Sequence, residues 1–456
     1  MIEEITTIPG LPAVADLDGD YDITQAALLL GSLTDGQLVL QNFNGGRDTA
    51  GTVSLLTGMG HRVSLTDDEV RIQRGESLSW DDCAEITFDG GLMPLTMLVG
   101  MLAGMNMTCR VRYSPDVNPD LLDELINILN KTGIDIAQPK EQELIIRESC
   151  LAPIELCIDS PLPYVKNCLL MIGLCSGCSV TIKEERASSG YLESLIERFG
   201  GNLTKRARKT IWREDPHDPR KREKTTDMDC AREIKLGVSS KLHGGIIEIP
   251  PDTNECAAML ALAVLARDDL TLQRVSLDRR LSKFMQYVKA SGVTPETTNR
   301  ETVDGRPFAD LSISGDRLKG RKISGSTAFA LIEQVPLMAV MAATSDGTTI
   351  IRDTGGLHDA LMRPFEEIIE NLTRMDIKCG RLDDGLAIEG GRELNGADFG
   401  PFDNRTVALA FYLVALAGKG KSYFDGFELI TDHYPKLARM MMELTSQQPA
   451  EMGRKP

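Results

Sequence analysis

Six strongly apolar runs recur along the 456-residue chain at intervals of about seventy to ninety residues. They are TQAALLLGSL (24–33), PLTMLVGMLAG (94–104), NCLLMIGLCSG (167–177), CAAMLALAVLA (256–266), VPLMAVMAAT (335–344) and TVALAFYLVALAG (406–418). Each run is apolar almost all round a helix, and a helix of that kind is buried on every side. The chain must therefore fold so that six helices are hidden from water.

Each run opens a repeating unit. A β-rich segment follows it, as in GQLVLQNF and NMTCRVRY, and an amphipathic helix usually comes next, as in LLDELINILNKTG (121–133) and FEEIIENLTRMD (365–376). The repeat is too long for a solenoid and fits a small α/β module. We therefore predict an α/β (α+β) fold of six modules, three in each of two domains, with the sheets wrapped outside the buried helices.

The pattern breaks around 240–250, where SSKLHGGIIEIPPD is rich in Gly and Pro. We place the first domain at 1–18 and 246–456 and the second at 19–245. A basic insertion lies inside the second domain at 204–224, with nine Lys or Arg residues against four Asp or Glu and two prolines. This insertion is predicted to be a solvated loop or β-extension, and a docking patch for an acidic or nucleic-acid partner is the alternative.

The charge and cysteine content narrow the classes of function. A net charge of −17 argues against a general nucleic-acid or anionic-membrane binder. The first ten residues, MIEEITTIPG, lack the basic and apolar regions of a signal peptide, so we expect a cytoplasmic protein. Its ten cysteines are then expected to be reduced, and Cys175 and Cys178, the C-x-x-C pair, are expected to be core thiols rather than metal ligands.

The stretch GDYDITQAALLL (19–30) predicts a helix start, where free backbone N–H groups attract anions. An anion site at a helix start usually has Lys or Arg nearby, whereas here Asp20 and Asp22 flank the first turn. We predict that these carboxylates cap the helix from within and that the position does not bind phosphate.

The modules resemble those of the enolpyruvyl (carboxyvinyl) transferases, and among them the EPSP synthases (3-phosphoshikimate 1-carboxyvinyltransferases), nearly end to end. The matching stretches include ITQAALLLGSLTDGQLVLQNFNGGRDTAGTVSLLTGMG, IEIPPDTNECAAMLALAVLARDDLTLQRV and EQVPLMAVMAATSDGTTIIRD. The resemblance implies a two-domain inverted α/β barrel of β-α-β-α-β-β modules joined by a hinge, with the site in the cleft between the domains. The family reaction transfers enolpyruvate from phosphoenolpyruvate to a hydroxyl of shikimate 3-phosphate and releases phosphate.

The resemblance also implies site residues. Glu333 falls on the carboxylate that the family uses in proton transfer, and it is the one candidate catalytic residue. Substrate-binding candidates are Asp48, Thr49, Asp252, His358, Arg363, Asp403 and Arg405. Each has a structural alternative: a helix acid for Glu333, a helix cap for Asp252, an Asp cap with an ion pair for Asp403 and Arg405, and a surface role for His358 and Arg363.

The departures from the family concern its cations. The family's G-S-K-S-x-S-x-R is replaced here by Gly19-Asp20-Tyr21-Asp22-Ile23-Thr24-Gln25-Ala26. Its N-A-G-T-x-x-R loop matches DGGLMPLT (89–96) without the arginine, and its late lysine falls on Asp432. Because both family substrates are anions, ordinary EPSP synthase activity is doubtful, and we predict an altered substrate or lost catalysis.

A non-catalytic scaffold or binding protein descended from EPSP synthase is the alternative. A third reading, an RNA 3′-terminal phosphate cyclase, lacks a histidine-centred signature. We expect neither a metal nor a cofactor, because no ligand cluster or Gly-rich phosphate loop stands out. A small-molecule ligand in the interdomain cleft and a protein partner both stay open. No membrane partner is expected, and a nucleic-acid contact stays open only at 204–224.

Overall fold

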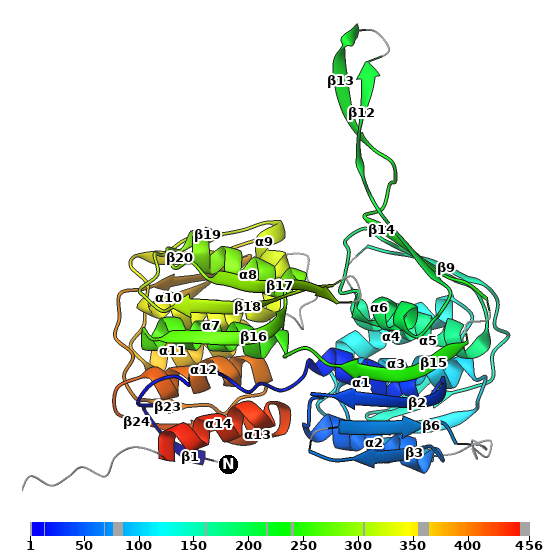
Figure 1. The fold of residues 1–456 in the computed structure, drawn as a ribbon, viewed down its shortest axis with the longest axis horizontal. Coiled ribbons are helices and arrows are strands. Elements are labelled where there is room, and N and C mark those ends of the chain that lie inside the picture. The colour runs from blue at the N-terminus through cyan, green and yellow to red at the C-terminus, as the bar shows by residue number, and fades with distance from the viewer. Residues whose placement is uncertain are drawn as a thin grey trace, which may run out of the picture. The chain divides into compact units, whose positions relative to one another are not determined.

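The computed structural model describes residues 2–12, 14–67, 69–75, 85–159, 162–215, 218–238, 241–303, 306–353 and 364–446 (Figure 1). The chain divides into two compact units. Unit 1 comprises Met1–Tyr21, Asn42–Arg47 and Ile249–Pro456, and unit 2 comprises Asp22–Gln41 and Asp48–Glu248. Among the described residues, no helix has the length and apolar character needed to cross a bilayer.

Unit 2 holds three four-stranded sheets with the same strand order. Their strands, in order across each sheet, are β15 (Leu242–Glu248), β2 (Thr34–Gln41), β4 (Glu69–Gln73) and β3 (Arg62–Leu65); β5 (Glu85–Phe88), β6 (Cys109–Tyr113), β8 (Glu143–Ile146) and β7 (Ile136–Lys140); β9 (Ile154–Ile158), β10 (Val180–Glu184), β14 (Arg232–Leu236) and β11 (Leu203–Ala207). In each sheet the first pair of strands is parallel and the other pairs are antiparallel. This repetition confirms the predicted module.

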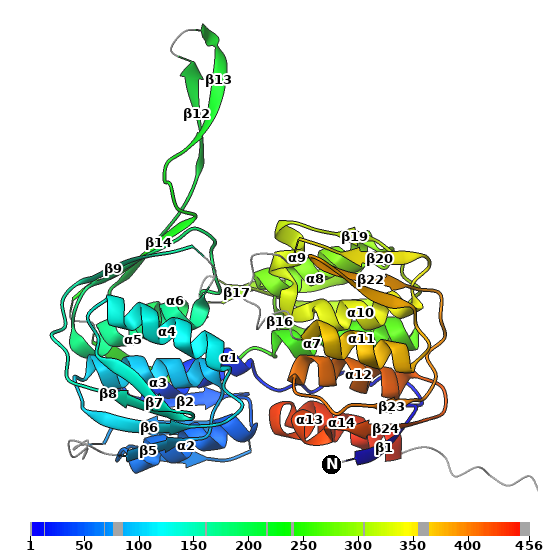
Figure 2. The same cartoon turned by 180° about the vertical axis from the view of Figure 1, so that it is seen from behind.

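Each module of unit 2 has one buried and one amphipathic helix. The buried helices are α1 (Tyr21–Gly31), α3 (Leu92–Gly104) and α5 (Pro163–Ser176), and the others are α2 (Arg47–Gly58), α4 (Pro119–Lys131) and α6 (Tyr191–Arg198). Every residue of α3 from Pro94 to Gly104 is buried, whereas α4 buries only Leu122, Leu125 and Leu129. The buried helices thus form the centre and the sheets lie outside them, as predicted (Figure 2).

Two glycines let α3 and α5 approach closely. A Cβ atom on Gly100 would lie 2.3 Å from the Cys168 carbonyl oxygen, and one on Gly104 would lie 2.6 Å from the Ile172 carbonyl oxygen. Real Cβ atoms are not found so close to backbone atoms, so any larger residue at Gly100 or Gly104 must push the two helices apart.

Unit 1 repeats the module with two incomplete sheets. Its strands, again in order across each sheet, are β16 (Asp269–Ser276), β18 (Arg306–Ser314) and β17 (Glu296–Val303); β19 (Lys322–Ile323), β20 (Thr348–Ile351), β22 (Gly385–Glu389) and β21 (Cys379–Leu382); β1 (Ile2–Thr6), β24 (Lys421–Asp425) and β23 (Asp398–Phe399). The buried helices are α7 (Thr253–Ala266), α10 (Val335–Thr344) and α12 (Arg405–Ala417). They pack together in one continuous apolar core, as expected for helices without a polar face.

The remaining helices of unit 1 are shorter or amphipathic. They are α8 (Arg279–Ala290), α9 (Ser326–Ala330), the 3-10 helix η1 (Ile332–Gln334), α11 (Pro364–Arg374), α13 (Phe427–His433) and α14 (Pro435–Ser446). Glu333 lies in η1, directly before α10.

The basic insertion forms a β-extension. Strands β12 (Thr210–Asp215) and β13 (Asp218–Thr226) pair antiparallel in a two-stranded sheet of their own, inserted between β11 and β14. Figures 1 and 2 show this ribbon standing well out from the sheet of β11 and β14.

Candidate functional site

Asp252 begins α7 and joins it to the segment that precedes α1. Its Oδ1 accepts hydrogen bonds from the Asn254 and Glu255 backbone N–H groups at 2.8 and 3.1 Å, which confirms the helix-cap reading. Its Oδ2 accepts the Tyr21 backbone N–H at 3.0 Å, so it also serves the first turn of α1. One carboxylate thus satisfies donors of two helices.

Asp18 and Glu255 form a buried acidic pair beside this cap. Both are fully buried, and Glu255 Oε2 accepts the Asp18 backbone N–H at 3.0 Å. Asp18 Oδ2 accepts the Lys436 backbone N–H at 2.9 Å. Burial raises the pKa of Asp18 to about 6, and it raises the pKa of Glu255 well above its usual value, reinforced by the charges of Asp18 and Asp252. The sequence gives one signal for this pair, an acid in the first turn of an otherwise apolar helix.

Arg280, on α8, lies among three carboxylates. Its guanidinium is 3.0 Å from Glu333 Oε2, 3.6 Å from Asp278 Oδ2 and 3.8 Å from Asp20 Oδ2. The sequence did not single out Arg280, because it lies five residues beyond the end of the matching stretch 247–275. The candidate catalytic carboxylate of Glu333, half-exposed at 53%, is therefore one of three carboxylates within 4 Å of the Arg280 guanidinium.

Arg405 is the first residue of α12 and stacks on Tyr21. Its guanidinium carbon lies 4.6 Å from the ring centroid of Tyr21, and its Nη1 lies 3.5 Å from His433 Nδ1. Asp403 is exposed, and the predicted Asp cap at this helix is wrong. Asn404 caps α12 instead, since its Oδ1 accepts the backbone N–H groups of Thr406 and Val407.

Asp48 and Thr49 are buried in the first turn of α2, in unit 2. Asp48 Oδ2 accepts the Gly91 backbone N–H at 3.1 Å, which ties α2 to the N-cap residue of α3. Thr49 Oγ1 accepts from Gln25 Nε2 at 3.1 Å, and Gln25 Oε1 accepts from Thr52 Oγ1 at 2.7 Å. The Asp–Thr pair of the resemblance is therefore held by hydrogen bonds within this unit.

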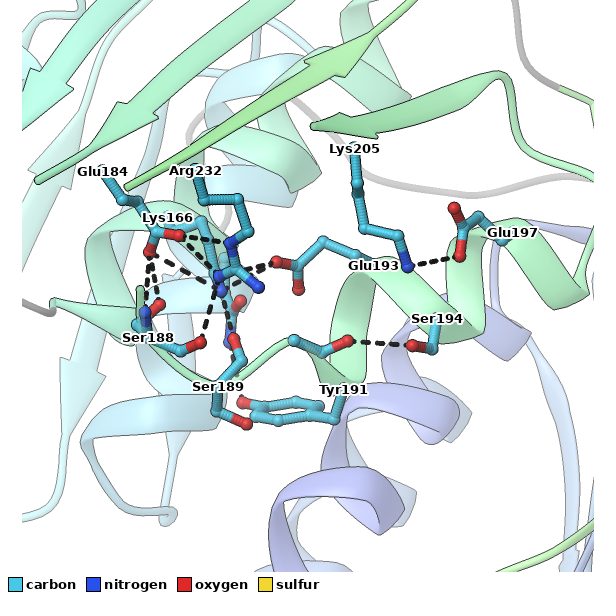
Figure 3. Close-up of polar contacts among 12 residues, drawn as sticks. Lys166, Glu184, Ser188, Ser189, Tyr191, Glu193, Ser194, Glu197, Lys205 and Arg232 are labelled. Atoms are coloured by element: carbon cyan, nitrogen blue, oxygen red, sulfur yellow. Dashed lines mark hydrogen bonds and ion pairs between the residues drawn. The ribbon is translucent and has the colours of Figure 1, made fainter. Parts of the chain in front are cut away.

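A second buried charge cluster lies in the third module (Figure 3). Lys166 Nζ, on α5, is 2.8 Å from Glu193 Oε1 and 3.9 Å from Glu184 Oε1, and all three side chains are 0% exposed. Arg232 completes it, with Nε 2.7 Å from Glu184 Oε2 and Nη2 3.0 Å from the Ser188 carbonyl oxygen. Burial lowers the pKa of Lys166, against the opposing attraction of the two carboxylates. Two cations and two carboxylates balance here.

The other candidates fall elsewhere. His358 and Arg363 lie outside the described residues, in the gap between 353 and 364. Among the residues that the structure describes, no group of three or more His, Cys, Asp or Glu side chains is arranged to hold a metal ion. Among the described residues, Asp252 accepts hydrogen bonds from backbone N–H groups, and Arg280 and Lys166 are paired with carboxylates.

Comparisons with known proteins agree with the module pattern. The chain is similar to the 3-phosphoshikimate 1-carboxyvinyltransferase of Synechococcus sp. (strain JA-3-3Ab), 26% identical over 447 residues that cover 95% of both proteins. A relative of the same name from Synechocystis sp. is 27% identical over 428 residues, covering 92% of this chain and 90% of that protein.

Solved structures show the same fold. An EPSP synthase from Acinetobacter baumannii covers 97% of this chain and 98% of its own, with a TM-score of 0.76 and 19% identity. The enolpyruvyl transferase NikO from Streptomyces tendae covers 97% of both chains, with a TM-score of 0.71 and 14% identity. The sequence model of the EPSP synthases (3-phosphoshikimate 1-carboxyvinyltransferase) matches residues 8–441. The chain therefore belongs to the EPSP synthase family.

Proposed function

We propose that this chain is a carboxyvinyltransferase-family protein that does not catalyse the family's ordinary transfer of enolpyruvate from phosphoenolpyruvate to shikimate 3-phosphate. One observation carries the proposal: Glu333, the carboxylate on which the resemblance places proton transfer, is in an ion pair with Arg280, which Asp278 and Asp20 also approach. Three carboxylates lie within 4 Å of this guanidinium, and each of them opposes the approach of an anion.

The binding free energy of an anionic ligand depends on the cations that contact it, and this chain lacks several of the family's cations. A hydrogen bond from a cation to an anionic ligand contributes about 1.5–3 kcal/mol. Loss of about 4 kcal/mol, the value of two or three such contacts, already weakens a micromolar ligand to a millimolar one. The sequence lacks more family cations than that, and it adds Asp20 and Asp22 at the first turn of α1.

Calorimetric titration with phosphoenolpyruvate and shikimate 3-phosphate, separately and together, tests the proposal. We expect no binding heat up to about 1 mM ligand and no release of phosphate when both are present. The Acinetobacter baumannii EPSP synthase, assayed in parallel, shows that the reagents are active. Sustained phosphate release by this chain would overturn the proposal.

A gain-of-binding variant makes the test sharper. D20S/Y21K/D22S restores the family's G-S-K-S at the start of α1, and we expect it to bind at least one of the two ligands more tightly than the parent chain does. D35N/D67N is a matched control, because it removes two exposed carboxylates outside the motif at 19–26. Equal affinities of the restored variant and the control would count against charge as the cause.

The alternative function is a non-catalytic scaffold or binding protein. The β12–β13 ribbon favours it, because it is a projection that contributes no residue to the motifs of the family reaction.

A further inference from the structure

A cavity of about 400 Å³ lies between α8 and the strands β17 and β18 in unit 1. Small-molecule sites in proteins usually have volumes of about 300–1,000 Å³, so this cavity is large enough for a small organic ligand. Its described lining includes none of the candidate residues of the family reaction. A ligand there would therefore occupy a second site, whatever the outcome for the proposed function.

Helix α8 forms one wall of the cavity with a stripe of four side chains. Ser282, Met285, Gln286 and Lys289 are spaced i, i+3, i+4 and i+7, which places them on one face of the helix. The fully buried residues of α8 stand at other positions, and they hold the helix against the core. The face that lines the cavity is therefore not the face that anchors the helix.

Strand β17 contributes Thr297 and Arg300 to the opposite wall. Residues three apart on a regular strand point to opposite faces. Here β17 carries a bulge, in which Asn299 and Arg300 together oppose one residue of β18, and Asn299 adopts a φ of 49°. Arg300 therefore lies on the same side as Thr297, and its Nε and Nη2 donate to Thr297 Oγ1 at 3.0 and 2.6 Å. The bulge thus holds a guanidinium against the cavity.

The neighbouring strands fix this bulge in place. Asp310, on the central strand β18, accepts a hydrogen bond from Asn299 Nδ2 through Oδ2 at 2.6 Å. Its Oδ1 accepts the Arg274 backbone N–H at 2.8 Å, in a second bulge on β16. Arg274 Nε lies 3.0 Å from Glu301 Oε1. The carboxylates of Asp310 and Glu301 therefore bind Asn299 and Arg274, and Arg300 is held by a neutral hydroxyl instead.

Arg300 and Lys289 are the cations on the described lining of the cavity. Both side chains are exposed, and neither is in an ion pair within the part of the chain that the structure describes. A guanidinium carries five N–H groups, and Thr297 accepts from only two of those on Arg300. A smaller adjoining cavity has one acid on its described lining, Glu301, which is already paired with Arg274. In a chain of net charge −17, these two cations at one cavity favour an anionic ligand.

Part of the cavity lining is apolar. Leu277 and Met285 are partly buried against the core of unit 1, and two proline rings extend this apolar surface. An inorganic anion would leave it uncovered, and a neutral apolar ligand would leave the two cations without a counter-charge. We propose that the cavity binds a small organic anion in which a carboxylate is joined to an apolar body. Arg300, whose planar fork matches a carboxylate, binds the charged end together with Lys289, and Leu277 and Met285 contact the body.

Fluorescence titration of the full chain with 2-naphthoate, an aromatic carboxylate, tests the proposal. We expect saturable binding that weakens when the salt is raised from about 50 to about 500 mM, because exposed charges are screened. The neutral isostere 2-naphthamide should bind at least tenfold more weakly, since it cannot pair with the two cations. The variant K289Q/R300Q should weaken naphthoate binding at least tenfold for the same reason.

A matched control and a local probe assign the binding to this cavity. K322Q/R392Q also removes one exposed lysine and one exposed arginine of unit 1, neither of which lines the cavity, and it should leave the affinity unchanged. In the chain labelled with ¹³C at its methionine methyl groups, the NMR signal of Met285, identified with M285L, should shift on titration. The signal of Met107, in unit 2, should not. Circular dichroism shows whether each variant is folded.

Three outcomes would overturn the proposal. One is the absence of saturable binding up to about 1 mM naphthoate in low salt. Another is binding that K289Q/R300Q leaves intact or that does not shift the Met285 signal, because the ligand would then lie elsewhere in the chain. The third is displacement of naphthoate by an equal concentration of inorganic phosphate, which would show that the apolar body contributes nothing and that the cavity takes inorganic anions.

Discussion

Replacing Asp18 by Asn should change how the stability of unit 1 depends on pH. The folded-state pKa of Asp18 is about 6 against an ordinary value of 3.8, because the carboxyl group is buried. A raised folded-state pKa means that the native state binds the proton more tightly than the unfolded state does. The contribution of this proton to stability is therefore complete below about pH 4 and is lost as the pH rises through 6.

The magnitude follows from the shift. About two pKa units at 1.36 kcal/mol each amount to about 3 kcal/mol, and roughly half of it falls between pH 5 and pH 8. Asn at position 18 avoids this cost, because it carries no charge. Its carbonyl can keep the hydrogen bond from the Lys436 backbone N–H, and its amide can donate to the Glu255 carboxylate, which the Asp18 side chain also contacts.

Scanning calorimetry at pH 5 and pH 8 measures the effect. For a unit of this size about 1.5 kcal/mol corresponds to roughly 3–6 °C, so D18N should gain that much in melting temperature at pH 8 relative to its difference from the parent chain at pH 5. D16N, at an exposed carboxylate nearby, should show no such change. A difference between D18N and the parent chain that is the same at both pH values would refute the reasoning.

Further changes test other parts of the structure. K166M should destabilise the chain by about 3–5 kcal/mol in denaturant unfolding, because it leaves Glu184 and Glu193 buried beside Arg232 alone, whereas K205A, at the more exposed pair with Glu197, should cost less than about 1 kcal/mol. G100A should cost about 1–3 kcal/mol by forcing α3 and α5 apart, whereas G58A, whose Cβ meets no atom within 4 Å, should be neutral or stabilising by up to about 1 kcal/mol. E367Q should flatten the pH dependence of stability through neutral pH. Burial raises the pKa of Glu367 to about 7, and the stability gained from its proton is lost as the pH rises through that value. A melting profile with unchanged pH dependence would contradict this.

The helices were predictable because their signal is local. The run 335–344 coincides with α10, and the run 94–104 lies within α3, which begins two residues earlier. An all-round apolar surface needs no knowledge of the partner. The strand pairing carries no comparable signal. The first module takes its outer strand, β15, from residues about 200 positions after β2, and β24 pairs with β1 from the other end of the chain. Sequence periodicity within a module cannot indicate such exchanges.

The residues of the candidate site also fall into two groups, those that a local sequence signal indicates and those that only the fold brings together. The cap at Asp252 was predictable from a short polar side chain before an apolar helix, and the error at Asp403 arose because two capping residues stand side by side, of which Asn404 alone reaches the N–H groups. The pairs Asp18–Glu255, Arg280–Glu333 and Lys166–Glu193 join residues 237, 53 and 27 positions apart, and only the fold brings them together.

These pairs bear on the chemistry of the family. In two of them a cation, Arg280 or Lys166, is already paired with carboxylates of the protein. Arg280 faces three carboxylates and Lys166 two, so a phosphate arriving at either would have to displace a carboxylate as well as shed its own water. The D20S/Y21K/D22S variant therefore tests both the missing lysine contact at α1 and whether the paired cations limit anion binding. D20S also removes one of the three carboxylates near Arg280. If D20S/Y21K/D22S gains affinity, the ion pairs of Lys166 and the contacts of Arg280 with Glu333 and Asp278 need not be released for an anion to bind. If it gains none while folding normally, the loss of the lysine and the added carboxylates at the start of α1 do not explain weak anion binding.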